Sequence, residues 1–522
     1  MTIINSRSVL STSVVLLASI PLLFVVYQSG QLSWTQWAGL WSVRLPGLLW
    51  NTLSLSVLVA LGSFTLGVSA AWLITRREFV GRRVAIWLMI LPLTIPTYVF
   101  AHIYTVLTDH DGWLGQLWLW LMGPNIPNPE LYNVFGVAFV LSLAGFSYVF
   151  LLVSDALTRS RIDIEEAARL HGLNPRQVFW RVSLPMLRPA IAAGIALVVL
   201  HVLSDFGAVS MLRYQTFTLS IYLQMSGRFD LQAAAGLSLV LVLLSLTFLV
   251  LERFFRDRQR YYSSRHPQQF QRRPASAMEQ LVIWLWLGSI TLFAFGLPVA
   301  WMLSWSVDAW QHALINQAFW GYVKNSLIVS ITAASLATVA ALPVALFHAR
   351  LRNKISQSYI HLSSLGFVLP GPVIALGILS FVLSTLPWIY GSIVVLLLAM
   401  LIRFLPLAVQ AQEAAVQQIS PSIEEAGRSL GATPWQNLRC VLIPMLRTGL
   451  VSAWVLVFID TLKELPATLL LRPTGFDTLP VRIWIEASEE MLELAAPAAL
   501  MLMLGTLPVL WFLLRQHEAA AK

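Results

Sequence analysis

Hydrophobic residues dominate this chain in long runs that short polar stretches separate. Each of twelve runs holds about 20 apolar residues, the length that an α-helix needs to cross the hydrocarbon core of a bilayer. The runs are continuous and do not alternate with polar residues, which excludes a closed β-barrel. The pattern predicts an all-α, polytopic membrane protein with about twelve transmembrane helices. The runs lie at residues 9–27, 47–75, 84–107, 133–154, 190–210, 232–252, 280–303, 325–347, 359–383, 391–411, 449–471 and 494–514.

Composition and charge support a membrane location and indicate an orientation. Hydrophobic residues make up 57% and charged residues 11% of the chain, and the mean hydropathy is +0.72. A soluble protein carries about twice this charged fraction. Most of the 34 Lys and Arg residues fall in polar stretches that the positive-inside rule assigns to the cytoplasm, together with both termini. The net charge of +9 is therefore an insertion signal, and we expect contacts with membrane lipids and none with nucleic acid.

The chain contains two copies of one pattern. A span that opens with Asn51 and ends at Arg76 matches a span that opens with Asn325 and ends at Arg350. Six spans, an even number, separate equivalent points, so both copies have the same orientation in the membrane. This indicates two parallel six-helix repeats and not an inverted repeat. The first copy has a longer outer loop at 108–132, an insertion that a protein surface tolerates.

These repeats divide the chain into segments. The first apolar run has no small-x-small cleavage site at its end, so we interpret it as a retained helix. The stretch between the repeats is rich in Arg and Gln, which is typical of a solvated linker near anionic lipid heads. The predicted segments are an N-terminal helix with an outer segment at 1–46, a first transport domain at 47–252, a cytoplasmic linker at 253–278, a seventh helix with an outer segment at 279–324, a second transport domain at 325–514 and a cytoplasmic tail at 515–522.

One polar stretch occurs in both repeats, 259 residues apart and without a gap. The first copy, at 165–185, reads E-E-A-A-R-L-H-G and closes with V-S-L-P; the second, at 424–444, reads E-E-A-G-R-S-L-G and closes with V-L-I-P. Polar residues before each copy suit a helix N-terminus, and the Gly stops the helix. Asn174-Pro175 and Thr433-Pro434 then place Pro at the first position of a second helix. We predict two rigid knobs that carry carboxylates; the alternative is an ordinary amphipathic connector.

Each knob resembles the EAA loop of ABC importer permeases, whose pattern is E-A-A-x3-G-x9-I-x-L-P and which docks into a groove on a separate ATPase subunit. The first copy departs from this pattern only at Val182, whereas the second has Gly427 for the second Ala and ends V-x-I-P. The resemblance is to a type I permease with both halves fused in one chain. It implies that the knobs couple the permease to the ATPase through Glu165, Glu166, Ala167, Gly172, Pro185, Glu424, Glu425, Gly431 and Pro444.

The chain has no sequence of its own for ATP hydrolysis. None of its four lysines stands in a G-x4-G-K-[ST] phosphate loop, and no nucleophile has a neighbouring base. Cys440 is the single cysteine, so an intrachain disulfide is excluded. We expect a transmembrane subunit that is not an enzyme and binds no cofactor. The resemblance implies ATP and magnesium on two copies of a cytoplasmic ATPase subunit, and a periplasmic substrate-binding protein on the other side.

Four ionisable residues follow the knobs at matching positions. His201 corresponds to Asp460 and Asp205 to Glu464, again 259 residues apart. Within each predicted span the two residues are four apart, on one helical face. Ionisable side chains inside a membrane are costly and usually functional, so we expect these four to line the translocation pathway. The alternative is a structural ion pair, such as Asp460 with Lys463.

Arg403 is a further candidate for the pathway. It lies within a span of the second repeat, and Ala144 occupies the equivalent position of the first. A one-sided Arg can instead extend toward the lipid headgroups, so function and structure stay equal alternatives. No His, Cys, Asp and Glu residues have the spacing of a permanent metal site. We therefore expect a cation cargo to make only transient contacts.

Sequences in the outer stretches of both repeats narrow the range of possible cargoes. The sequences S-D-F-G-A-V at 204–209, K-E-L-P-A-T at 463–468 and L-R-P-T-G-F-D-T-L at 471–479 are similar to ferric-iron importer permeases. The resemblance implies a bacterial inner-membrane complex that receives Fe³⁺ from its binding protein and moves it by alternating access. Fused permeases for thiamine or phosphonates share the architecture and stay alternatives. A gradient-driven secondary transporter is a third, although it would not need EAA loops.

Overall fold

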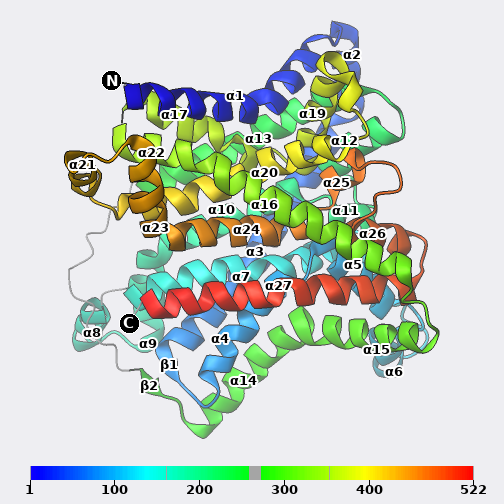
Figure 1. Ribbon diagram of the computed structural model, residues 1–522. Coiled ribbons are helices and arrows are strands. Elements are labelled where there is room, and N and C mark those ends of the chain that lie inside the picture. Colours follow the sequence, from blue (N-terminus) through cyan, green and yellow to red (C-terminus); the bar gives the residue numbers. More distant parts are fainter. Residues whose placement is uncertain (1, 160–161, 258–271, 352, 521–522) are drawn as a thin grey trace. The chain divides into compact units, whose positions relative to one another are not determined.

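The structure is a computed structural model of the chain, and it describes every residue except 1, 160–161, 258–271, 352 and 521–522 (Figure 1). The side chains at 2–7, 162–163, 166, 175–176 and 512–520, among others, also lie outside the description. Within the described residues the regular structure is helical apart from two short parallel strands, β1 (Arg77–Glu78) and β2 (Arg273–Pro274). The all-α prediction is confirmed.

The elements of the first part of the chain follow the predicted order. They are α1 (Thr2–Gly30), α2 (Trp34–Val43), α3 (Leu45–Arg76), α4 (Arg82–Ile90), η1 (Leu91–Thr94), α5 (Thr97–Thr108), α6 (Trp113–Met122), α7 (Val134–Arg159), α8 (Ile162–Leu170), α9 (Pro175–Val178), η2 (Phe179–Ser183), α10 (Leu184–Ser204), α11 (Gly207–Met211), α12 (Phe217–Ser226) and α13 (Leu231–Asp257).

The second part repeats this order. Its elements are α14 (Ala277–Thr291), η3 (Leu292–Gly296), α15 (Leu297–Gln311), α16 (Gln317–Leu351), α17 (Lys354–Ser363), α18 (Leu365–Val368), α19 (Gly371–Thr385), η4 (Pro387–Ile389), α20 (Ile393–Gln417), α21 (Pro421–Ser429), α22 (Pro434–Asn437), η5 (Leu438–Leu442), α23 (Ile443–Met445), α24 (Arg447–Leu462), α25 (Pro466–Leu471), α26 (Leu479–Ser488) and α27 (Leu492–Ala520).

The helices lie where the apolar runs predict them, but some of the runs are broken into shorter helices. Among the described residues, eight helices are long and apolar enough to cross a membrane, and ten spans result if two bent pairs each count as one. The bent pairs are 82–94 with 97–108, at 96°, and 434–445 with 447–462, at 73°. The run predicted at 359–383 holds a shorter apolar helix, Gly371–Thr385, whereas α27 continues through the run predicted at 494–514. Apolar character alone does not show such breaks; Pro96, directly before α5, marks one of them.

The chain forms two compact units that do not coincide with the two sequence repeats. The α3 unit contains residues 44–219 and 243–305, and the α16 unit contains 1–43, 220–242 and 306–522. The α3 unit, which holds most of the first repeat, therefore also includes α14. The α16 unit, which holds most of the second repeat, also includes α1.

The first exchanged helix, α1, packs within the α16 unit. Ser11 Oγ donates to the backbone oxygen of Pro343 at 3.0 Å, and the rings of Phe24 and Phe381 lie 5.4 Å apart in an edge-to-face arrangement. A helix that precedes the first repeat is thus part of the core of the second.

The reciprocal exchange is made by α14, η3 and the start of α15, which pack within the α3 unit. Trp284 Nε1 donates to the backbone oxygen of Val80 at 3.0 Å, and the hydroxyl of Tyr104 donates to the backbone oxygen of Phe293. The pairing of β1 with β2 joins the end of the linker to the same unit.

Each unit has its knob at one end (Figure 1). In the α16 unit, α21 and α22 lie at the same end as the start of α1 and the C-terminal end of α27, whereas α2 and α26 lie at the other. In the α3 unit, α8 and α9 lie at the end that also holds β1 and β2, and α6 lies at the opposite end. Within each unit, the segments predicted to face the cytoplasm therefore share one end.

Candidate functional site

Both knobs have the order of helix, glycine and helix that their sequence predicts. Gly172 and Gly431 follow α8 and α21 with φ angles of 87° and 84°, in the left-handed region that suits glycine at a helix C-terminus. Pro175 and Pro434 begin α9 and α22, where the missing N–H costs nothing, whereas Pro185 and Pro444 lie in continuous helix just after η2 and η5. The predicted helix ends are confirmed.

Polar side chains start the second short helix of each knob. Asn174 Oδ1 accepts from the backbone N of Gln177 at 2.9 Å, and Gln177 Oε1 accepts from the backbone N of Asn174 at 3.0 Å. Thr433 and Gln436 form the same reciprocal capping box. Such boxes satisfy backbone donors that the first turn leaves free, so each knob is locally rigid.

The first glutamate of each copy points inward and pairs with an arginine. Glu165 Oε1 lies 2.5 Å from an Nη atom of Arg76, the last residue of α3, and also accepts from Ser183 Oγ at 3.0 Å. Glu424 Oε1 lies 2.6 Å from Nε of Arg350, near the end of α16. Both carboxylates are buried. These two glutamates therefore fasten the knobs to the long helix that opens each repeat.

The second glutamate has a different position. Glu425 is exposed on α21. Glu166, its counterpart, lies outside the side chains that the structure describes. Ala167, Gly172 and Gly431 are exposed as well, so these positions of the family pattern form an open surface.

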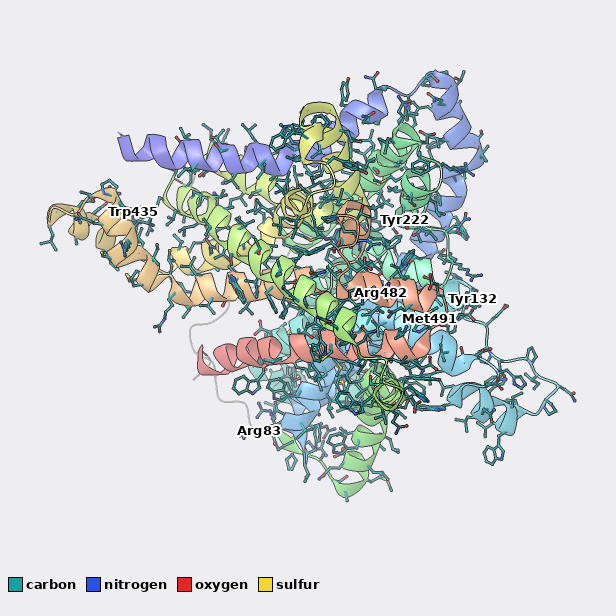
Figure 2. The ribbon with its side chains drawn as sticks, turned by 45° about the vertical axis from the view of Figure 1, so that its right-hand side comes forward. Arg83, Tyr132, Tyr222, Trp435, Arg482 and Met491 are labelled. Carbon is teal, nitrogen blue, oxygen red and sulfur yellow. The ribbon has the colours of Figure 1, made fainter. Side chains whose placement is uncertain are left out.

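Large apolar side chains extend from the same surfaces. Leu430 is 89% exposed and Trp435 65%, and Figure 2 shows Trp435 on the second knob. In the first knob, Leu170 is 88% and Trp180 64% exposed.

The departure of the second copy from the family pattern has a steric cause. A Cβ added to Gly427 would lie 2.8 Å from Oδ1 of Asn437, a buried side chain whose Nδ2 donates to the backbone oxygen of Glu424 at 3.0 Å. The first copy has Ala168 and Val178 at these two positions. The glycine therefore accommodates an asparagine that the other knob lacks.

Behind the knobs, the helices end sooner than the sequence predicts. The continuous helices expected over 190–210 and 449–471 are wrong, because α10 ends one residue before Asp205 and α24 ends two residues before Glu464. Asp205 Oδ1 accepts from the backbone N of Ala208 at 3.0 Å, and Glu464 Oε1 from that of Ala467 at 3.1 Å. Both carboxylates cap the short helix that follows, α11 or α25. A polar cap of this kind ends one helix and starts another.

The two caps are completed differently. Thr97 Oγ1 donates to Asp205 Oδ2 at 2.5 Å, whereas Arg403 Nε lies 3.0 Å from Glu464 Oε2. Both carboxylates are buried. Arg403 is thus part of a structural ion pair, and a role of Asp205, Glu464 and Arg403 in the pathway stays a prediction.

The other two candidates are more accessible. The side chain of Asp460 is 45% exposed, and its Oδ1 lies 3.8 Å from Nζ of Lys463. His201 is half-buried, with its ring centroid 5.9 Å from that of Tyr148. Among the described residues, no three His, Cys, Asp or Glu side chains form a group that could hold a metal ion. A pathway role for His201 and Asp460 also stays a prediction.

The outer sequence at 471–479 is held in place by a hydrogen bond and by ion pairs. Asn325 Nδ2 donates to the backbone oxygen of Asp477 at 2.9 Å, as Asn51 Nδ2 does to Gln215 at 3.0 Å in the other repeat. The carboxylate of Asp477 forms ion pairs with Arg472 and Arg482. The asparagines that reveal the repeat in the sequence thus hold equivalent outer turns.

Sequence reasoning misses three residues of the site. It identifies Arg76 and Arg350 only as the ends of matching spans, and it does not identify Thr97. The two arginines could have been found from the sequence because both stand at the end of matching apolar spans. A charged side chain at such a position needs a partner. No sequence signal connects Thr97 to a carboxylate far along the chain.

The class of protein follows from comparison with known families. The family described as binding-protein-dependent transport system inner membrane component matches residues 63–261 and 337–518, more than half of the chain and once in each repeat. The chain belongs to this family. It is a multi-pass, transmembrane permease subunit of an ABC importer.

Relatives with curated names refine this class. The Fe(3+)-transport system permease protein FbpB 2 of Haemophilus influenzae is 31% identical over 504 residues, which cover 95% of either chain. The putative ferric transport system permease protein FbpB 1 of the same organism is 26% identical over 84% of this chain and 72% of its own. The sulfate transport system permease protein CysT of Escherichia coli is 30% identical over 45% of this chain and 86% of its own.

Proposed function

We propose that this permease imports ferric iron, with energy from two copies of a separate ATPase and with cargo from a periplasmic binding protein. The observation that carries the cargo is the similarity to a named Fe(3+) permease along 95% of both chains. The similarity to a sulfate permease covers less than half of this chain. In this proposal both termini and both knobs face the cytoplasm.

The two knobs support docking of two identical ATPase subunits. Each presents an exposed leucine and an exposed tryptophan beside its capped short helices: Leu170 and Trp180 in the first knob, Leu430 and Trp435 in the second. Tryptophan side chains often carry much of the binding free energy of an interface. These side chains occupy different positions in the two knobs, but the shared order of helix, glycine and helix suits a partner that supplies two equivalent grooves.

The chemistry of the candidate pathway suits brief contact with a hard cation. Fe³⁺ prefers oxygen ligands, as hard cations do. The partly exposed carboxylate of Asp460 supplies oxygen, but the described residues form no group that would hold the ion. Weak, sequential contact lets the cargo leave after the units change from one access state to the other.

Reconstitution tests the proposal. The permease is purified with its ATPase, placed in proteoliposomes and supplied with binding protein loaded with radioactive Fe³⁺. We expect uptake that requires ATP and persists when ionophores collapse all ion gradients. Uptake that stops with the ionophores identifies a secondary transporter, and ATP-dependent uptake of radioactive sulfate in place of iron rejects the cargo.

A further inference from the structure

Each knob is attached to its unit in three places. The chain enters from α7 or α20 and leaves through η2 or η5, and a buried ion pair ties α8 to α3 or α21 to α16. A force applied to a knob can follow any of these routes. The geometry distinguishes between them.

The route through the following helix contains a π-helical turn in both repeats and is bent in the second, whereas 179–204 is one continuous helix in the first. η2 and η5 are π-helical turns at equivalent positions, 179–183 and 438–442. Such turns are rare and are frequent sites of helix kinks. In the α16 unit, the helix axis also turns by 73° between 434–445 and 447–462. A displacement of the second knob is therefore not passed in a straight line along α24.

The ion pairs are short and shielded from water. The side chains of Arg76 and Glu165 are 8% and 6% exposed, and those of Arg350 and Glu424 are 16% and 4% exposed. A charge-assisted hydrogen bond is stronger in such surroundings than at a surface. The ion pairs are thus firm attachments.

The second pair also has a second anchor and an apolar base. Arg350 donates from an Nη atom to the backbone oxygen of Ile419 at 3.0 Å. Leu346 of α16 and Leu442 of η5 belong to the apolar cluster at the root of this knob, and Ile423 of α21 packs against it. The end of α16 and the knob therefore form one packed body.

We propose that Glu165 and Glu424 are positioning residues that transmit movement of each knob to α3 and α16, the first long helices of the two repeats. The neighbouring Glu166 and Glu425 are left for contact with the partner. This division of roles within each E-E pair rests on the proposed function, because it supposes that an ATPase moves the knobs.

The test replaces each buried glutamate with glutamine, which removes the carboxylate charge and keeps the side-chain volume. Glu165→Gln and Glu424→Gln are compared with wild type for ATPase co-purification, ATP hydrolysis and uptake per ATP. We expect normal association and continued hydrolysis, with uptake per ATP lowered about tenfold, within the range that single residues of a coupling route show. Wild-type uptake per ATP in both variants overturns the proposal.

A double variant separates transmission from folding. A single change leaves a buried charge without its partner and lowers stability, whereas Arg350→Gln with Glu424→Gln removes both charges. We expect the double variant to assemble in wild-type amounts and to remain as poorly coupled as Glu424→Gln. If the double variant regains wild-type uptake per ATP, the ion pair only stabilises the fold and the proposal is wrong.

A third measurement needs neither iron nor ATPase. Cys440, the only cysteine, is exposed in η5 and accepts a spin label without further substitution. We expect greater label mobility in the double variant than in wild type, because the knob has lost one attachment. Unchanged mobility contradicts the attachment itself. Failure of wild-type iron uptake would instead reject the proposed cargo and leave this readout intact.

Discussion

A pair of substitutions in the second knob tests whether Gly427 with Asn437 packs in the same way as the pair at the equivalent positions of the first knob. Gly427→Ala places a Cβ 2.8 Å from Oδ1 of Asn437, and Asn437→Val removes the hydrogen bond to the backbone oxygen of Glu424. Together the two changes install the pair that the first knob has, Ala168 and Val178. We expect each single variant to loosen the knob and the double variant to be more stable than the sum of the two single effects predicts.

The magnitudes follow from the structure. Overpacking at Gly427 costs about 1–3 kcal/mol, and alanine in a helix returns about 1 kcal/mol, so Gly427→Ala alone destabilises the knob by up to about 2 kcal/mol. Asn437→Val leaves a buried carbonyl without its donor, at about 1–3 kcal/mol. In the double variant the steric conflict is absent and the gain from alanine in the helix remains, but the hydrogen bond is still lost, so the knob is up to about 2 kcal/mol less stable than in wild type. The coupling free energy between the two sites is therefore about 1–3 kcal/mol in favour of the pair.

Hydrogen exchange of the backbone amides of α21 measures these effects, because it reports the free energy of local opening. The four proteins of the double-mutant cycle are compared in the same lipid nanodiscs. Ala168→Gly in the first knob is the matched control, since it removes a methyl group in a site without the asparagine. Strictly additive effects of the two changes would refute the steric explanation.

Other substitutions give sharp outcomes. Glu425→Lys reverses an exposed charge, so it should reduce ATPase co-purification without lowering the yield of the permease; normal co-purification would exclude this residue from the docking surface. Asp205→Ala removes a cap and should lower the midpoint of thermal unfolding by the equivalent of about 1–2 kcal/mol. Glu464→Gln leaves Arg403 without its buried partner and should cost about 3–5 kcal/mol, which Arg403→Leu in the same chain should largely recover. Gly371→Ala puts a Cβ 2.7 Å from an Nη atom of Arg403 and should lower stability by about 1–3 kcal/mol, read from the same unfolding curves.

Those parts of the fold that depend on local chemistry can be predicted from the sequence. The knobs have caps, a stop signal and a proline within a few residues of one another, so their two-helix form follows from the residues alone. The duplication also identifies matching residues correctly: Ala208 and Ala467 donate to the carboxylates of Asp205 and Glu464, as equivalent positions should.

Features that depend on distant partners could not be predicted. Which glutamate of each E-E pair turns inward is decided by an arginine 89 residues earlier in the first repeat and 74 residues earlier in the second. The breaks before Asp205 and Glu464 were missed for a related reason. The apolar pattern continues through them, and only the hydrogen bonds of the carboxylates reveal the end of the helix.

The exchange of α1 and α14 between the two repeats has a consequence for biosynthesis. The helices of residues 277–305 pack within the α3 unit, so that unit is incomplete until these residues have left the ribosome. Likewise, α1 cannot pack within the α16 unit until residues beyond 306 have been synthesised. At about 5–20 residues per second, α1 spends on the order of tens of seconds among lipids or insertion factors before its permanent neighbours exist. Neither repeat is a self-sufficient folding unit, so neither compact body is complete before residue 305 has been synthesised.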